Sequence, residues 1–311
     1  MTAETTSTAH GPAAAPGTVV PGIPAGRRRA PLGRLLRAEV RWIFRRPRTL
    51  AVLALLAVLP VITGIAVDLT MNGGSAPSAP SGPGPVGADG GPPIFVTMAT
   101  SAFVLPLGSL MTLLMLLLPL TVAMASGDAL AGEQSHGTLR GWLLTPVSRG
   151  RLLLVKSVGV LVVALVAAGL VVTSGLVTGL VLAGTDGLVS MSGTELSIAD
   201  VLWRLGVAVA WATLYLMAIG AVALAISAST EHPMVVVVGV LGGLIVSVVL
   251  LQISALDWLH PYLLPSSLAG LVDLIRDPVS FDGLAEGAFR AGCYLVIGIS
   301  LAYARLTTRD G

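Results

Sequence analysis

Six long apolar runs limit what this chain can fold into more than any other feature. Each run has about as many residues as a helix needs to cross the roughly 30 Å hydrocarbon core of a bilayer. Only 11% of the 311 residues are charged and the mean hydropathy is +0.89, so a soluble globular fold is excluded. The runs predict an all-α integral membrane protein with six transmembrane helices, at about 49–67, 94–126, 152–183, 201–228, 234–256 and 288–306.

Two prolines and two glycines mark special points within the predicted spans. Pro106 and Pro119 lie in the second span, which is longer than one crossing requires, and we expect both to kink it. Gly175 and Gly179 in the third span have the spacing that lets two helices approach closely. We interpret this glycine pair as a packing feature only.

The N-terminal part of the chain contains two segments of different composition. Residues 1–31 are rich in Ala, Thr, Pro and Gly, which predicts a disordered tail. Residues 32–47 repeat apolar residues at helical spacing with arginines between them, which predicts an amphipathic helix in the headgroup plane. Trp42 would lie at the membrane interface and Pro47 would end the helix. Residues 48–311 would form the six-span transmembrane domain.

Residues 257–287 separate the last two predicted spans. The stretch 260–275 reads HPYLLPSSLAGLVDLI, which is amphipathic, interrupted by proline and too short to cross a bilayer. We therefore predict short interfacial or re-entrant helices between spans five and six.

The distribution of arginine predicts the orientation of the chain. Nine arginines precede the first span, and further cations lie between spans two and three. The loops on the other side, with their edges, carry only Arg204, Arg276 and Arg290. By the positive-inside rule, we predict that both termini and the connection between spans two and three are cytoplasmic, in a plasma membrane.

Several kinds of chemistry lack the residues that they need. Lys156 is the only lysine, and Val155 stands before it where a P-loop requires glycine, so the chain is not an ATPase of that type. No charged residue lies near the middle of a predicted span, which favours an external energy source over coupling to an ion gradient. There is no HExxH motif, and the four histidines do not converge at one depth. Cys293 is the only cysteine. We expect no bound cofactor, no metal site and no nucleic-acid partner.

The connection between spans two and three, residues 127–151, is polar and has helix signals of its own. Thr138 can cap a short helix, and Pro146 ends that helix after about two turns. Leu139 and Leu143 would share one face of it. Polar groups nearby come from Glu133, His136 and Arg140. These patterns alone are compatible with a contact surface and with an ordinary cytoplasmic loop.

An ordered set of residues over 133–156 resembles the corresponding segment of type-2 ABC exporter permeases, the membrane-spanning partners of ATP-binding cassette proteins. The set consists of Glu133, Gly137, Thr138, Leu139, Leu143, Leu144, Pro146, Arg149, Leu152 and Lys156. The six-span layout and the short helices before the last span agree with the resemblance. Gly141 departs from it, because glycine weakens the short helix.

The resemblance implies that this connection docks on a cytoplasmic ATPase and carries its motion into the membrane. The residues expected at that contact are Glu133, His136, Gly137, Thr138, Leu139, Arg140, Leu143, Pro146 and Arg149. It also implies that ATP and Mg are bound by the ATPase, and that a second copy or a related permease pairs with this chain. We therefore predict the permease subunit of an ATP-driven exporter whose substrate is not identified. The alternatives are a non-transporting membrane scaffold and, from a different class, a membrane-embedded hydrolase.

Overall fold

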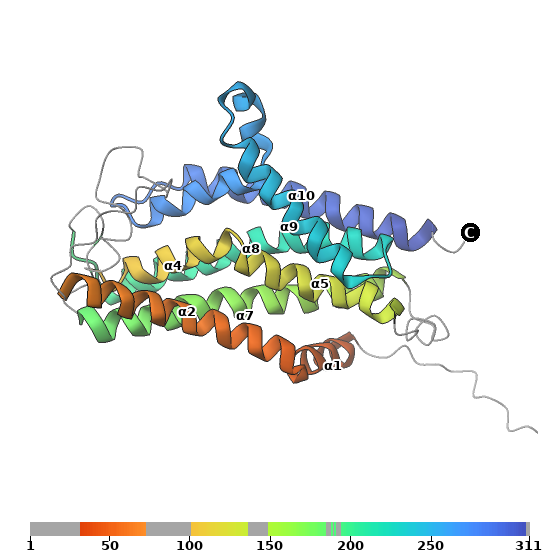
Figure 1. Ribbon diagram of the computed structural model, residues 1–311, viewed down its shortest axis with the longest axis horizontal. Helices are drawn as coiled ribbons and strands as arrows, with labels where there is room; N and C mark the ends of the chain where they lie inside the picture. The colour runs from red at the N-terminus through yellow and green to blue at the C-terminus, as the bar shows by residue number, and fades with distance from the viewer. Residues whose placement is uncertain are drawn as a thin grey trace, which may run out of the picture. The chain divides into compact units, whose positions relative to one another are not determined.

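All the regular elements in the described part of the chain are helices. The computed structural model describes residues 32–72, 101–135, 149–184, 188, 190 and 194–308. In chain order these residues form α1 (Leu32–Arg45), α2 (Pro47–Asn72), α4 (Val104–Leu114), α5 (Leu117–Ser135), α7 (Arg149–Ala183), α8 (Ile198–Ser229), α9 (Pro233–Leu250), the 3₁₀ helices η2 (Ser254–Tyr262) and η3 (Leu264–Leu274), and α10 (Asp282–Thr308) (Figure 1).

Five of the described helices are long and apolar enough to cross a membrane by themselves, namely α2, α7, α8, α9 and α10. The pair α4 and α5 meets the same test as one span that is broken and bent by 52°. These helices confirm the predicted multi-pass, all-helical fold. The number of spans among the described residues is five, or six when the bent pair counts as one.

The break between α4 and α5 has a physical cause in Pro119. The break lies at Met115 and Leu116, and Pro119 is in the first turn of α5. Proline has no N–H to donate to the carbonyl four residues earlier, here that of Met115, and its ring crowds that carbonyl. The kink predicted at Pro119 is confirmed. Pro106 lies in the first turn of α4, where backbone N–H groups have no helical partner. The residues before 101 lie outside the described ones, so the kink predicted at Pro106 stays a prediction.

The helix α8 is largely buried, and two neighbours pack directly on it. A Cβ added to Gly220 of α8 would lie 2.7 Å from the side chain of Val160 on α7. A Cβ added to Gly298 of α10 would lie 2.7 Å from the backbone carbonyl carbon of Ala221 on α8. Any larger residue at either glycine would push α7 or α10 away from the centre of the bundle.

The two glycines of the third span lie against the start of the second span. A Cβ on Gly175 would be 2.8 Å from Cα of Pro106, and one on Gly179 would be 2.7 Å from the carbonyl oxygen of Ala102. The backbones of α7 and of the 102–106 segment are therefore in contact without side chains between them. This confirms that the glycine pair serves close packing.

The fifth span is shorter than predicted, and the chain after it continues in 3₁₀ helices. The helix α9 ends at Leu250, not near 256. None of the residues in η2 is buried, whereas η3 packs on α10, where a Cβ on Gly270 would lie 2.7 Å from the carbonyl carbon of Gly283. Short helices thus separate the last two spans, as predicted. The helix α10 begins at Asp282, earlier than the predicted start at 288.

The ends of several helices meet at one end of the bundle. The start of α2 contacts α5 near Asp128, the start of α9 contacts α5 at Gly127, and the start of α7 contacts the end of α10. We call this end, where α1 also lies, the α1 end (Figure 1). Because α5 extends to Ser135 and α7 begins at Arg149, helices occupy both edges of the predicted 127–151 connection. Only residues 136–148 separate the two helices, and we call them the connector.

Candidate functional site

The amphipathic helix α1 packs on α7 at a glycine. A Cβ on Gly159 would lie 3.1 Å from Cδ1 of Ile43 and 3.3 Å from Cγ of Glu39. The arginines of α1 lie on its exposed side, while its aliphatic residues are half-buried. The sequence thus directs the apolar face of α1 onto α7 and α2, and a larger residue at 159 would separate α1 from α7.

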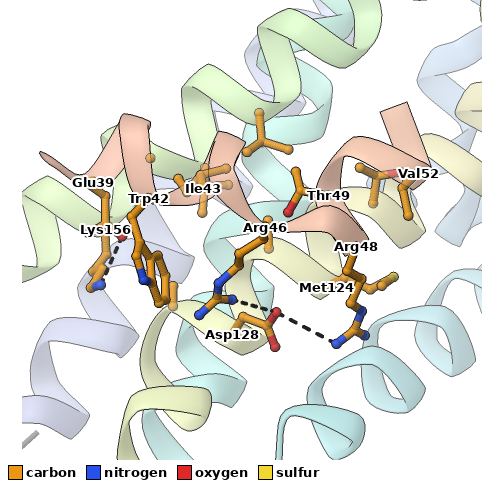
Figure 2. A pocket seen from close by; sticks show the side chains of 16 residues that line it. Glu39, Trp42, Ile43, Arg46, Arg48, Thr49, Val52, Met124, Asp128 and Lys156 are labelled. Carbon is orange, nitrogen blue, oxygen red and sulfur yellow. Dashed lines mark hydrogen bonds and ion pairs between the residues drawn. The ribbon is translucent and has the colours of Figure 1, made fainter. Parts of the chain in front are cut away.

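A buried ion pair joins α1 to α7. The Lys156 ammonium donates a hydrogen bond of 2.9 Å to Oε1 of Glu39 (Figure 2). The Lys156 side chain is 1% exposed and the Glu39 side chain 12% exposed. A pair removed from water this completely has a high desolvation cost, and loss of one partner leaves an uncompensated charge in an apolar site. The only lysine of the chain therefore holds the amphipathic helix α1 to α7.

A second group of charged side chains joins the α1–α2 junction to α5. Arg46 donates a 3.0 Å hydrogen bond to Oδ2 of Asp128, and the Arg48 guanidinium lies 3.8 Å from the same oxygen (Figure 2). The Arg46 guanidinium also lies 3.4 Å from the centroid of the Trp42 ring, a cation–π contact. Asp128 thus accepts from one arginine while a second lies nearby, at a point where the chain turns from α1 into α2.

The two ion pairs contact both helices that lead into the connector. Asp128 is on α5, which runs to Ser135, and Lys156 is on α7, which begins at Arg149. Their partners Glu39 and Arg46 lie within two turns of each other along α1 and its junction with α2. We call these six residues, Glu39, Trp42, Arg46, Arg48, Asp128 and Lys156, the α1 clamp. A displacement of either helix beside the connector would therefore also move α1 and α2.

The end of α5 is also held by α8 and α9. The Ser227 hydroxyl of α8 donates to the Gly127 carbonyl at 3.3 Å and accepts from the Ala131 N–H at 3.0 Å. Ser227 is fully buried. A Cβ on Gly127 would lie 3.1 Å from the carbonyl oxygen of Pro233, at the start of α9. The α5 segment before the connector is therefore fixed to the centre of the bundle.

Arg149 is the one predicted contact residue whose side chain is described. Its guanidinium donates to the carbonyl oxygens of Leu306 at 2.7 Å and Thr307 at 3.2 Å. These are carbonyls of the last turn of α10, where the helix dipole favours a positive charge. The structure therefore places Arg149 as a cap on the last span, at the residue where the chain leaves the connector and enters α7.

The other predicted contact residues lie outside what the structure describes. Glu133 belongs to the last turn of α5 by its backbone, and its side chain is not among the described ones. His136, Gly137, Thr138, Leu139, Arg140, Leu143 and Pro146 all fall in the connector, outside the described residues. Their assignment to an ATPase contact stays a prediction.

Sequence analysis missed most of the α1 clamp. Glu39 is the only carboxylate between Arg27 and Asp68, and Asp128 directly follows a long apolar run. A lone acid in an arginine-rich amphipathic helix, and a lone lysine at the start of a span, are the signals that could have suggested a pair. The partners are 117 residues apart in one pair and 82 in the other, so sequence spacing did not connect them.

The donor groups of the described residues do not form a metal site. No group of three or more His, Cys, Asp or Glu side chains able to hold a metal ion occurs among the described residues. The cations of the α1 clamp each lie within ion-pair distance of one of its two carboxylates. This arrangement supports mechanical linkage between helices. Several membrane-spanning helices and the amphipathic helix α1 are joined beside the connector.

A multi-pass helical membrane protein with an amphipathic helix fixed at the entrance to its first span is the class that these features define. The sequence family described as ABC-2 family transporter protein matches residues 34–281, which is most of the chain. The chain therefore belongs to the ABC-2 family of transporter membrane proteins, and it is a non-catalytic transporter subunit. Members of the family bind no cofactor themselves, and a partner ATPase handles ATP. No curated protein sequence matches the chain significantly.

Proposed function

We propose that this chain is the permease of an exporter whose partner ATPase docks on residues 133–149. The observation that supports this most strongly is the α1 clamp, which joins α1 and α2 to both helices beside the connector. Closure of the ATPase on ATP would displace the connector, and α5 and α7 would carry that displacement into spans two and three. Arg149 would extend it to the last span through the carbonyls of α10.

A complete pathway requires two such subunits. The described part of this chain supplies at most six spans, and the family resemblance implies twice that number. We propose that a second copy or a related permease pairs with it, and that two ATPase subunits bind the two connectors. The direction of transport is proposed as outward.

The function is tested by purifying the chain with its ATPase. Candidate cassette proteins from the same genome would be co-expressed with the chain, and each complex extracted in mild detergent and reconstituted in vesicles. We expect co-purification and an ATP hydrolysis rate that depends on the permease. If the chain inserts normally but no cassette protein of the genome co-purifies with it, the non-transporting scaffold is favoured.

We further propose that the α1 end is cytoplasmic. The exposed arginines Arg34, Arg37 and Arg41 of α1 lie at this end, whereas Arg204 and Arg290 bond to η3 and the residues after it at the other end. A positive excess on one side is the pattern that sets orientation in membranes. In a Cys293→Ser background, single cysteines at Ser81, Ser192 and Asp282 should react with an impermeant maleimide added outside cells. Reaction of Ser148→Cys from outside intact cells would contradict this topology.

A further inference from the structure

A groove of about 790 Å³ lies between α8, the end of η2 and α10. Its volume is in the range of sites that hold a small molecule. Most of its lining is aliphatic or aromatic, and several of the lining side chains on α10 are exposed, so the groove is open at the surface of the helices. The aliphatic and aromatic residues of the lining include Val222, Ile226, Phe289, Ile297 and Leu301. In a membrane, such a groove faces acyl chains and not water.

The two arginines that line the groove differ in their partners. Arg290 donates to the hydroxyls of Ser266 and Ser267 at 2.6 and 2.7 Å and to Glu286 at 2.6 Å, so its charge is compensated. Arg305 is exposed. Across the described ranges, no carboxylate lies within ion-pair distance of Arg305. Among the described residues, therefore, the uncompensated one of the two groove arginines is at the α1 end.

The stretch of α10 between these groups is longer than one leaflet is thick. Arg305 is fifteen residues after Arg290, which is about 22 Å along a helix. Half of the hydrocarbon core is about 15 Å thick. An acyl chain that starts beside Arg305 and runs toward the start of α10 would therefore reach the middle of the membrane shortly before it reached Cys293. An apolar groove long enough to cover one leaflet, with a cation at its interfacial end, fits an acyl chain that carries an anionic headgroup.

We propose that this groove binds an anionic phospholipid, with its phosphate at Arg305 and one acyl chain along α10 and α8. A second copy of the chain is a poorer occupant, because it would have to bring a carboxylate to Arg305. At the α1 end, the described carboxylates Glu39, Asp128 and Glu231 each already have a partner. A second copy would thus bury the Arg305 guanidinium without compensation from these groups.

The proposal is tested by native mass spectrometry of the full chain in neutral detergent. Phosphatidylglycerol and phosphatidylcholine with identical acyl chains would be added at equal concentrations. We expect one phosphatidylglycerol to be retained per chain in preference to phosphatidylcholine. Arg305→Gln should lower the retention of phosphatidylglycerol about fivefold, as expected for one arginine near a phosphate, and leave phosphatidylcholine unchanged. Arg41→Gln removes an exposed arginine from the same end but not from the groove, and should retain the wild-type preference.

A groove-filling variant separates lipid from protein as the occupant. Val222→Trp should reduce the retention of both lipids while the oligomeric state in the same spectra stays that of the wild type. If the wild type retains neither lipid preferentially and Val222→Trp instead breaks a dimer, a second copy covers the groove and the proposal is wrong. Equal retention of phosphatidylglycerol by wild type and Arg305→Gln would also overturn it. Arg305→Gln changes an exposed side chain, so this arm holds even if Val222→Trp fails to fold.

Discussion

Replacing Lys156 with methionine should release α1 from α7 while the spans stay inserted. The change removes the ammonium and leaves the Glu39 carboxylate, only 12% exposed, without its partner. Breaking a buried pair in this way costs several kcal/mol when burial is complete, and we expect about 2 kcal/mol here because Glu39 keeps some contact with solvent. Undocking of α1 should then become about thirtyfold more frequent.

Limited trypsin digestion of purified protein in detergent measures this undocking. The exposed arginines Arg34, Arg37 and Arg41 are potential cleavage sites that a docked helix protects. Mass spectrometry of the fragments should show faster cleavage within α1 for Lys156→Met, with the spans still intact.

The matched control for this experiment is the double variant Glu39→Met with Lys156→Met. Removing both charges leaves no unpaired group, so its cleavage rate should return close to that of the wild type. Cleavage of the single variant at the wild-type rate would show that the ion pair does not hold α1. Equal, fast cleavage of the single and double variants would assign the effect to lost packing.

Glu133→Ala should uncouple ATP hydrolysis from transport without disturbing the fold. We propose that Glu133 accepts hydrogen bonds or an ion pair from the docked ATPase, since its backbone lies in the last turn of α5, beside the connector. A hydrogen bond to a charged group contributes about 1.5–3 kcal/mol, so its loss should weaken docking by at least tenfold. The measurements are co-purification of the ATPase, its hydrolysis rate and substrate efflux from vesicles.

Two further variants place the Glu133 result in context. Thr138→Ala should give a milder defect of the same kind, because an N-cap contributes about 1 kcal/mol to a helix. Glu231→Ala changes an acid in the turn between α8 and α9, outside the residues predicted to contact the ATPase, and should leave efflux unchanged. Normal efflux from a normally inserted Glu133→Ala protein would defeat the coupling assignment and leave the helical fold untouched.

The fold could be predicted from sequence because long apolar runs have few alternatives in a bilayer. A run of about 20 apolar residues satisfies its backbone hydrogen bonds only as a helix. The break after Leu114 followed from Pro119, whose lost hydrogen bond is a local effect. The end of α9 at Leu250 was missed, because residues 251–256 are apolar enough to continue a span, whereas the helix ends there and the chain continues as η2 from Ser254.

The candidate site was predictable only in part. The connector was identified through polar residues and family resemblance, which are properties of contiguous sequence. The α1 clamp depends on single charged residues brought together from four helices, and none of them forms a motif with its neighbours. Arg149 was expected at an ATPase contact, but its described partners are the carbonyls of Leu306 and Thr307, which follow only from the antiparallel packing of α7 and α10.

The two halves of the broken second span are attached to different neighbours. The start of α4 is in backbone contact with α7 at Gly175 and Gly179, whereas the end of α5 is bonded to α8 through Ser227. Only Met115 and Leu116 link these halves, at the point where Pro119 removes a helical hydrogen bond. A force applied at the connector would bend the second span most readily at this joint, which lies between the contact of α4 with α7 and that of α5 with α8. The stiffness of these two residues would then set how far a movement at one membrane surface is transmitted to the other.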